Sequence, residues 1–528
     1  MKPLSRAAFG SWWIVGRCLA ASFAASMMPA ALAHAEGNLH KVNHIIVVMQ
    51  ENHSFDNYFG ALPYVPGGPY HAGPCGKNDH RCVDGLSCTR DASNELRCSN
   101  SNLDDDGSTV FAFHDPRYCV GPDLDHGWPG SHIEANYSDP AGTLASSPND
   151  GFVRRNDVAG QPDNGGPEAP DSDDTMGFYT QGDLPFYYSL AQSFAIDDRY
   201  FSSVIGPTFP NRAYALAATS FGHLTTSEIL PPPVGYKPIT GTIYDLLDAA
   251  GVSWTNYFSD VPTSAIFRPS AFPFVTPHTQ PISVFLAQAA AGTLPQVAFV
   301  DPNFGFFGTS LENDEHPPTN IRKGEGFVSQ IVNALRNGPN WRDSVLFIAY
   351  DEHGGFYDHV APAPADQDGA RSPDGIDPGQ CADLSNPPGS ETPGGGAQCA
   401  VSRGDALAIC PGFTPSGPYP AECANFDQLG FRVPFIAVSP FAKRSYVSHT
   451  VGDHTSILAL IEKRFTSNNQ GNGNSHIQHL TLRDANADPL EDLFNFSSPP
   501  SLDVAIPTAP GPSPSDPGCP FVPTPTHG

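Results

Sequence analysis

The sequence predicts an α/β fold, a three-layer sandwich with a mostly parallel central sheet and Cys-rich loop insertions. Apolar runs rich in β-branched residues, each ended by polar residues, are typical of strands buried on both faces of such a sheet. An amphipathic stretch of helical period lies downstream of two of these runs. The runs are spread along the chain rather than grouped in two blocks, which favours one large domain.

The pattern of apolar residues predicts four strands and one helix. Residues 324–336 have apolar side chains at helical spacing, and the Asn-Gly-Pro sequence at 337–339 is a helix stop signal. Strands that alternate with helices indicate a sheet between two helix layers. The four predicted strands are 44–49, 297–300, 345–350 and 433–438.

Polar side chains follow two of these strands at the point where each ends. Glu51 and Asn52 come after the first strand, and Asp351 and Glu352 come after the third. In mostly parallel sheets the ligand lies outside the carboxyl ends of the strands. We therefore expect these four side chains to meet at one edge of the sheet.

The same four side chains have the chemistry of a divalent-cation site. Their oxygens suit calcium, magnesium or manganese better than zinc. For the first pair, the alternative is capping of a following helix, which Ser54 can also do. For the second pair, which precedes His353 and two glycines, the alternative is an exposed turn. Two carboxylates after a buried strand would be costly without a cation or hydrogen bonds.

Thr208 is the candidate nucleophile. Pro207 and Pro210 restrict the backbone around it, which helps to aim a hydroxyl at a reacting atom. Residues 213–218 continue as a predicted helix, and a helix N-terminus can attract phosphate. A metal ion would lower the pKa of the hydroxyl and permit covalent attack through a phosphoryl-threonine intermediate. An ordinary N-terminal helix cap is the alternative.

Two histidines, His126 and His316, lie beside acidic residues on predicted loops. Each can protonate a leaving group or bind phosphate. The alternative for either histidine alone is an ordinary surface residue.

Residues 1–35 have the features of a Sec-type signal peptide. Positive charges at Lys2, Arg6 and Arg17 accompany an apolar, Ala-rich run that closes with Ala-His-Ala at 33–35. A transmembrane anchor is the alternative, but the run is short and rich in Ala and Ser. We expect a secreted or periplasmic protein with no stable membrane anchor.

Charge and cysteine content fit export. Loss of the three cationic residues of the signal changes the formal net charge from −28 to −31, and an acidic surface disfavours nucleic acid as a partner. Loss of Cys18 leaves ten cysteines, which predicts up to five disulfides. They form a cluster of five, a cluster of four and the single Cys519, so complete pairing requires a bridge between these groups.

The predicted main domain covers residues 36–497. Two stretches inside it, about 61–120 and 361–428, are dense in Gly, Pro, Asp and Cys and are predicted insertions. Residues 498–528 are rich in proline and are predicted to form an extended C-terminal tail.

Four segments in chain order, 50–56, 208–212, 351–360 and 432–440, resemble the bacterial and plant phosphoesterase family. That family includes non-specific phospholipases C and acid phosphatases and has an alkaline-phosphatase-like α/β fold. The resemblance runs from about Lys41 to Phe465 and implies roles for seven side chains. The implied metal ligands are Glu51, Asn52, Asp351 and Glu352, the nucleophile is Thr208, and the phosphate-side histidines are His126 and His316. We further predict that Asn211, Arg212 and His353 contact the substrate or support the site.

The resulting hypothesis is a secreted, metal-dependent phosphoester hydrolase of the phospholipase C type, with a phospholipid or small phosphoester as substrate. Threonine at position 208 favours this branch, because the acid phosphatases of the family tend to have serine there. An acid phosphatase acting on phosphomonoesters is the first alternative, since it shares every catalytic residue. A non-catalytic extracellular binding protein is the second.

Overall fold

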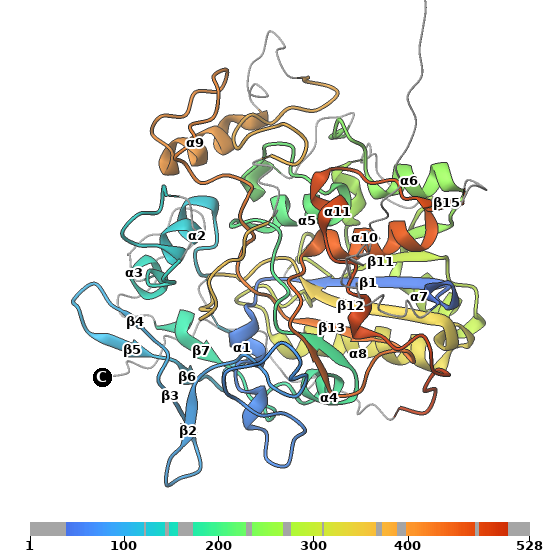
Figure 1. Cartoon of the computed structure of the whole chain (residues 1–528), viewed down its shortest axis with the longest axis horizontal. Helices are drawn as coiled ribbons and strands as arrows, with labels where there is room; N and C mark the ends of the chain where they lie inside the picture. The colour runs from blue at the N-terminus through green and yellow to red at the C-terminus, as the bar shows by residue number, and fades with distance from the viewer. Residues whose placement is uncertain are drawn as a thin grey trace, which may run out of the picture. The chain divides into compact units, whose positions relative to one another are not determined.

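A computed structural model describes residues 38–120, 123–142, 147–156, 173–228, 235–267, 276–308, 311–365, 372–387, 398–469 and 475–504. Within these residues, an eight-stranded sheet has the order β10-β9-β11-β1-β12-β13-β8-β14 (Figure 1). The predicted signal peptide and most of the predicted tail lie outside the described residues. The strands of the sheet are β1 (His44–Gln50), β8 (Ala195–Asp197), β9 (Trp254–Phe258), β10 (Thr279–Pro281), β11 (Val297–Asp301), β12 (Ser344–Tyr350), β13 (Phe435–Val438) and β14 (Tyr446–Ser448).

The sheet is mostly parallel, and the four predicted strands are β1, β11, β12 and β13. β1 pairs in parallel with β11 on one side and with β12 on the other. β13 is the exception, because it runs antiparallel to both β12 and β8. The start of β13 therefore lies at the sheet edge where β1 and β12 end, and Ser439 lies at the opposite edge.

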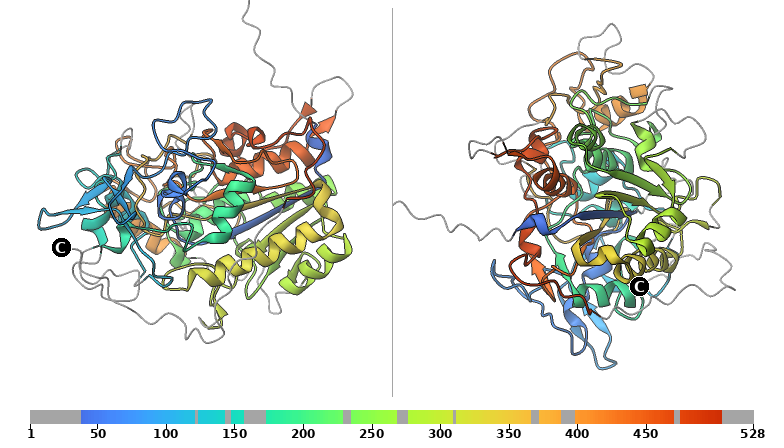
Figure 2. Two further views of the ribbon diagram at one scale, coloured as in Figure 1. Left: turned by 90° about the horizontal axis from the view of Figure 1, so that it is seen from below. Right: turned by 90° about the vertical axis from the view of Figure 1, so that its right-hand side faces the viewer.

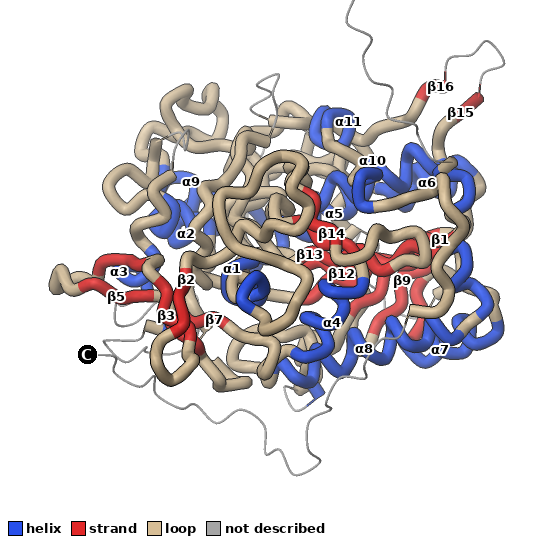
Figure 3. Tube along the Cα trace, turned by 60° about the horizontal axis from the view of Figure 1, so that its bottom comes forward, coloured by secondary structure: helices blue, strands red, loops and turns tan. Residues whose placement is uncertain are grey.

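Helices cover both faces of the sheet and complete the predicted three layers (Figures 1 and 3). On one face, α5 (Thr208–Ala217), α6 (Ile243–Ala250) and α10 (His454–Phe465) pack together. On the other face, α8 (Ile321–Asn337) packs against α4 (Pro185–Ser193) and α7 (Ile282–Ala291). Figure 2 shows the sheet edge-on between the two layers.

Burial explains why the predicted elements form where they do. Ile45, Ile46 and Val48 of β1 are fully buried because helices cover both faces of the sheet. α8 corresponds to the predicted helix 324–336, and it begins after the N-cap Asn320, whose side chain accepts a hydrogen bond from the N–H of Arg322. Its apolar stripe packs into the main core.

Short elements lie outside the central sheet. β2 (Cys88–Arg90) pairs with β3 (Leu96–Cys98), and β4 (Ser101–Leu103) pairs with β5 (Thr109–Phe111) in two antiparallel hairpins. Both hairpins fall within the predicted insertion 61–120. The remaining elements are α1 (Phe55–Phe59), α2 (Trp128–Ala135), α3 (Phe152–Asn156), α9 (Ala400–Ile409), α11 (Leu482–Asn486), β6 (Phe113–His114), β7 (Gly177–Phe178), β15 (Asn468–Asn469) and β16 (Ser475–His476).

The disulfides between described residues join cysteines of the same cluster. Four bridges join residues that are 7 to 18 positions apart in sequence, and Cys119 is disulfide-bonded as well. These bridges fit the expectation that covalent links hold Gly- and Pro-rich stretches that lack a periodic apolar pattern. The four pairs are Cys75–Cys82, Cys88–Cys98, Cys381–Cys399 and Cys410–Cys423.

A search of the described helices found none with the length and apolar character needed to cross a bilayer.

Candidate active site

The ends of β1 and β12 bring the four predicted metal ligands together. The two strands pair in parallel along their whole length, up to Gln50 opposite Tyr350, so the residues that follow leave the sheet side by side. The backbone N–H of Asn52 donates to Oδ1 of Asp351 at 3.4 Å. All four side chains are buried, with Glu51 the most exposed at 6%. The expected convergence is present.

Close backbone approach shapes this edge of the sheet. Asn52 has a φ of 62° and Gly354 a φ of 64°, the left-handed region that glycine and asparagine tolerate best. A Cβ on Gly354 would lie 2.2 Å from the carbonyl oxygen of Asn52, so only glycine fits there. The N–H of Gly354 also donates to Oε2 of Glu352 at 2.6 Å, which fixes that carboxylate.

Two oxygens of the predicted ligand set have no hydrogen-bond donor among the described residues. They are Oδ1 of Asn52 and Oε1 of Glu352, both buried. A buried acceptor without a donor is costly, and a divalent cation would remove that cost. The donor set fits such an ion, because all four side chains offer hard oxygen ligands and none offers sulfur or imidazole.

Arg212 neutralises part of the charge of this group. Its Nη2 lies 3.0 Å from Oε1 of Glu51, and its Nε donates to Oδ2 of Asp351 at 3.0 Å. Burial raises the pKa of Glu51 to about 7, although the nearby guanidinium opposes that rise. Arg212 thus contacts two predicted metal ligands.

Helix α5 carries Thr208 at its first position, one turn before Arg212. Residues four apart on a helix share a face, with their Cβ atoms about 5–6 Å apart, so Thr208 and the guanidinium that contacts both acids lie on the same side of α5. Thr208 is 7% exposed. Asn211 bonds the loop that precedes it: its Nδ2 donates to the carbonyl oxygen of Gly206, and its Oδ1 accepts from the N–H of Val204. Asn211 therefore anchors the loop that leads into Thr208.

The two predicted histidines lie beside each other, with ring centroids 5.9 Å apart. His126 Nε2 lies 3.6 Å from Oε1 of Glu352, so this histidine adjoins the predicted metal ligands. Asp123 bridges the pair, 3.7 Å from His126 Nδ1 through one oxygen and 3.7 Å from His316 Nε2 through the other. Asp123 was not predicted as a site residue from the sequence, although it lies three residues before His126.

Charge keeps both histidines protonated near neutral pH. Burial lowers the pKa of His126, but Glu352 and Asp123 outweigh it and raise that pKa to about 9. Burial also lowers the pKa of His316, but the charges of Asp123 and Glu51 outweigh burial and raise that pKa to about 10. Two imidazolium groups beside a buried oxygen cluster can bind phosphate and donate a proton. In their neutral forms, His126 and His316 would instead offer ligand atoms within 4.8 Å of each other and of the Asp123 carboxylate, an arrangement compatible with a second cation.

Two buried carboxylates, Glu134 and Glu315, support residues of the candidate site. Neither was predicted as a site residue from the sequence. Oε2 of Glu134, on α2, lies 2.8 Å from Nε2 of His353, whose Nδ1 lies 3.4 Å from Oε2 of Glu352. His353 therefore orients Glu352, a predicted metal ligand. Glu134 lies far from these residues in sequence, and no local pattern marks it.

Glu315 is the second of these carboxylates. It accepts hydrogen bonds from the hydroxyls of Tyr58 (2.6 Å), Tyr187 (2.6 Å) and Tyr350 (2.5 Å). Its backbone has a φ of 78°, a conformation that is rare for a residue with a side chain. The three tyrosines thus fix the backbone immediately before His316. This cluster could not be predicted from the sequence, because the tyrosines lie far from Glu315 along the chain.

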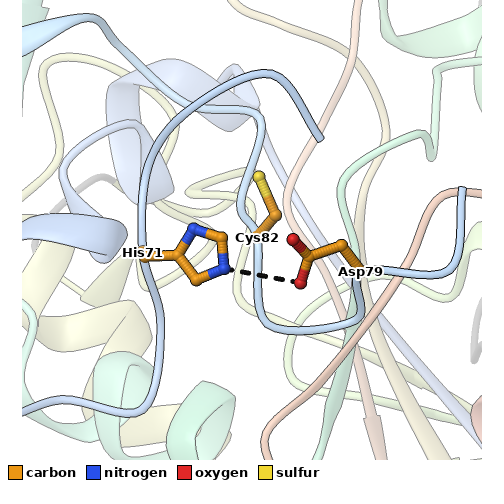
Figure 4. A group of neighbouring side chains, drawn as sticks. All are labelled: His71, Asp79 and Cys82. Carbon is orange, nitrogen blue, oxygen red and sulfur yellow. Dashed lines mark ion pairs between the residues drawn. The ribbon is translucent and has the colours of Figure 1, made fainter. Parts of the chain in front are cut away.

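A second group of potential ligands, His71, Asp79 and Cys82, is not a metal site of the same kind. Figure 4 shows the His71–Asp79 ion pair, which has an N–O distance of 3.4 Å, and the sulfur of Cys82 beside it. That sulfur is bonded to Cys75, so it is not available as a thiolate ligand. Both members of the ion pair are about half exposed, at 53% and 46%.

Sequence comparison finds similar proteins over most of the chain. Non-specific phospholipase C1 of Arabidopsis thaliana is 30% identical over 469 residues, which cover 87% of this chain and 72% of that protein. Phospholipase C B of Mycobacterium tuberculosis (strain H37Rv) is 29% identical over 502 residues, which cover 88% of this chain and 80% of that protein.

Solved structures give more distant similarities. The lipoteichoic acid synthase LtaP of Listeria monocytogenes matches with a TM-score of 0.31 and 12% identity, over 58% of this chain and 70% of that one. A protein in the alkaline phosphatase superfamily from Vibrio parahaemolyticus matches with a TM-score of 0.30 and 7% identity, over 58% and 63% of the two chains.

The model of the Phosphoesterase family matches residues 42–466. This range contains every predicted site residue and all the strands of the central sheet. The chain belongs to the Phosphoesterase family and is a hydrolase of phosphoric esters.

Proposed function

We propose that this protein is a secreted, metal-dependent phosphodiesterase of the phospholipase C type, which acts through a covalent intermediate on Thr208. The observation that carries the proposal is the meeting of four buried oxygen ligands with two histidines and with Arg212 of α5, which lies one turn after Thr208. The metal ligands would be Glu51, Asn52, Asp351 and Glu352. When bound there, a divalent cation would stabilise the Thr208 alkoxide and the negative charge on the phosphate oxygens.

The chain's own residues account for the remaining steps. The Oγ of Thr208 forms a bond to phosphorus while the bond from phosphorus to the alcohol oxygen breaks, and the hydroxyl proton leaves to solvent. His126 or His316 donates the proton that the departing alcohol needs, because neighbouring carboxylates outweigh burial and raise the pKa of both imidazoles. Water then forms a bond to phosphorus while the bond from phosphorus to Thr208 Oγ breaks. A proton from that water returns to the threonine oxygen, and the histidine regains its proton from solvent.

Positioning residues hold this arrangement in place. Arg212 fixes Glu51 and Asp351, and Asn211 fixes the loop before Thr208. His353, bonded to Glu134, orients Glu352. Because these contacts are buried, they limit the freedom of the reacting groups before substrate binds.

The phospholipase C branch is preferred over the acid phosphatase branch for two reasons. The similar curated proteins named above are phospholipases C, and position 208 is threonine. The predicted signal peptide at 1–35 and the disulfides support export.

The test compares wild type with Thr208→Ala on p-nitrophenylphosphorylcholine and p-nitrophenyl phosphate, each with and without chelator. We expect turnover of the phosphodiester to exceed that of the phosphomonoester, and to fall by about 10³-fold or more without Thr208 or without metal. Thr225→Ala is the matched control, because Thr225 is half-buried near α5 and has no proposed role.

Each alternative predicts a different result. Faster turnover of the phosphomonoester would favour an acid phosphatase. Full activity of Thr208→Ala would reject the nucleophile. No turnover and no metal binding by wild type would favour a binding protein.

A further inference from the structure

One loop beside the candidate active site exposes large apolar side chains to solvent. Among the described residues, three of the four most exposed large apolar side chains lie within six positions of one another: Phe306 (57% exposed), Phe307 (66%) and Leu311 (73%). The fourth, Leu384 (60%), lies in another part of the chain. Single exposed apolar residues are common, but such a cluster usually marks an interaction surface.

Both ends of this loop belong to the site. It leaves the sheet at Asp301, the end of β11, which pairs with β1. It returns at Asp314, whose carbonyl oxygen accepts a hydrogen bond from the N–H of Glu51 at 2.9 Å. Within it, the ring of Phe304 packs against Arg212, 4.8 Å from the guanidinium carbon. The exposed side chains are therefore carried by the segment that borders the predicted metal ligands.

Polar contacts fix the backbone of this loop. The exposure of its apolar side chains therefore does not result from a lack of backbone hydrogen bonds. The carboxylate of Asp260 accepts from the N–H groups of Phe304 (3.2 Å) and Phe306 (3.0 Å). The N–H of Asn313 donates to the carbonyl oxygen of Asn303 at 3.0 Å and closes the base. Phe306 and Phe307 pack edge to face with centroids 5.1 Å apart, which makes them one apolar unit.

The chemistry of the surroundings indicates what this unit contacts. Hydrolysis of a soluble phosphoester gives no reason to display apolar rings next to the site, whereas a phospholipid is presented in an apolar aggregate. The formal net charge of −28 opposes an anionic surface. A lipid surface with zwitterionic headgroups fits both the apolar side chains and the negative charge.

We propose that Phe306, Phe307 and Leu311 insert into the surface of a zwitterionic phospholipid bilayer and bring its phosphodiesters to Thr208. The proposal rests on the proposed phospholipase C function and adds the surface by which the enzyme meets its substrate.

The experiment compares wild type with Phe306→Ser/Phe307→Ser on phosphatidylcholine vesicles and on soluble p-nitrophenylphosphorylcholine. We expect vesicle hydrolysis by the variant to fall by about tenfold or more, because each ring removed from the interface weakens binding substantially. Turnover of the soluble substrate should stay within about twofold, because neither ring takes part in the reaction. Leu384→Ser is the matched control and should change neither activity.

Vesicle sedimentation separates this proposal from the proposed function. In the Thr208→Ala background, the protein should sediment with phosphatidylcholine vesicles, and the added double substitution should abolish sedimentation. If wild type hydrolyses no phosphodiester but this binding pattern holds, the function is wrong and the lipid contact stands. Equal losses on both substrates, unchanged vesicle hydrolysis, an equal effect of Leu384→Ser, or stronger binding to phosphatidylglycerol vesicles would overturn the lipid-contact proposal.

Discussion

Asn52 lies just past β1 with left-handed backbone geometry (φ 62°) and a side-chain oxygen that has no donor among the described residues. The sequence allowed two interpretations of this residue, a metal ligand or a cap for the following helix. The capping role belongs to Ser54, whose Oγ accepts the N–H of Asn57 at the start of α1. The oxygen of Asn52 is therefore free for a cation.

Asn52→Ala should strongly weaken metal binding at the site. We expect added Ca²⁺, Mg²⁺ or Mn²⁺ to raise the melting temperature of metal-depleted wild type, because an ion that binds only the folded state stabilises it. In the variant that rise should be lost, with metal affinity lower by about 10–100-fold or more. Differential scanning fluorimetry and calorimetric titration measure both quantities.

Asn94→Ala is the control for backbone strain, because Asn94 is exposed and has a similar φ of 67°. It should lower the melting temperature by a comparable amount and leave the metal-induced rise intact. Equal metal responses in wild type and Asn52→Ala would show that Asn52 is not a ligand.

Single residues could be predicted where a strand ends, and not where a partner lies far away in sequence. Glu51 and Asp351 follow long apolar runs, so their place at the sheet edge was visible. Glu134 and Glu315 act through His353 and through three tyrosines from other elements. No sequence spacing records such contacts.

At the scale of elements, the direction of β13 was not predictable. Its apolar run has the same composition as the parallel strands, and composition does not set direction. Because β13 is antiparallel, Arg432, three residues before its first residue, lies at the edge where β1 ends. Its guanidinium is fully buried and pairs with Asp56 of α1 (3.1 Å) and with Asp358 (2.9 Å).

His359 completes this network, 2.6 Å from Oδ2 of Asp56 and 3.3 Å from Oδ1 of Asp84. Burial lowers the pKa of His359, but Asp56 and the hydrogen bonds to both acids outweigh burial and the opposing charge of Arg432, and raise it to about 10. The folded state therefore holds this proton more tightly than the unfolded chain. The stability it adds is present below about pH 6.5 and is lost as the pH rises toward 10.

His359→Gln should destabilise the protein in a pH-dependent way. We expect a loss of about 1–3 kcal/mol in the free energy of unfolding at pH 6, and a much smaller loss at pH 10. Urea unfolding at pH 6, 8 and 10 measures this difference. His71→Gln, at a largely exposed ion pair, should change little at any of these pH values. A His359→Gln effect that stays constant from pH 6 to pH 10 would contradict the charge assignment.

At the scale of the whole molecule, the class of the fold followed from the sequence. Long apolar runs alternating with helical periods indicate a mostly parallel sheet between helix layers, and eight strands with one antiparallel member form that sheet. Four of the eight strands of this sheet were not predicted. β8, β10 and β14 have three residues each, and β9 mixes polar and aromatic residues, so none gives a clear periodic signal.

The disulfides lead to a further prediction about distant parts of the chain. Eight of the described cysteines pair within their own clusters, and Cys119 is disulfide-bonded. Of the two cysteines that remain, Cys18 falls in the predicted signal peptide, so we predict a bridge from Cys119 to Cys519. Peptide mapping of the exported protein without reductant should recover these two cysteines in one linked peptide. Recovery of Cys519 as a free thiol would contradict the prediction.

The central claim is that hydrolysis proceeds in two steps through an ester on Thr208. Each in-line displacement inverts the configuration at phosphorus, so two displacements restore it. The direct measurement is the stereochemical course of hydrolysis of a chiral phosphorothioate diester in oxygen-labelled water. The account predicts net retention at phosphorus, and net inversion would contradict it, because inversion requires that water attack the substrate directly.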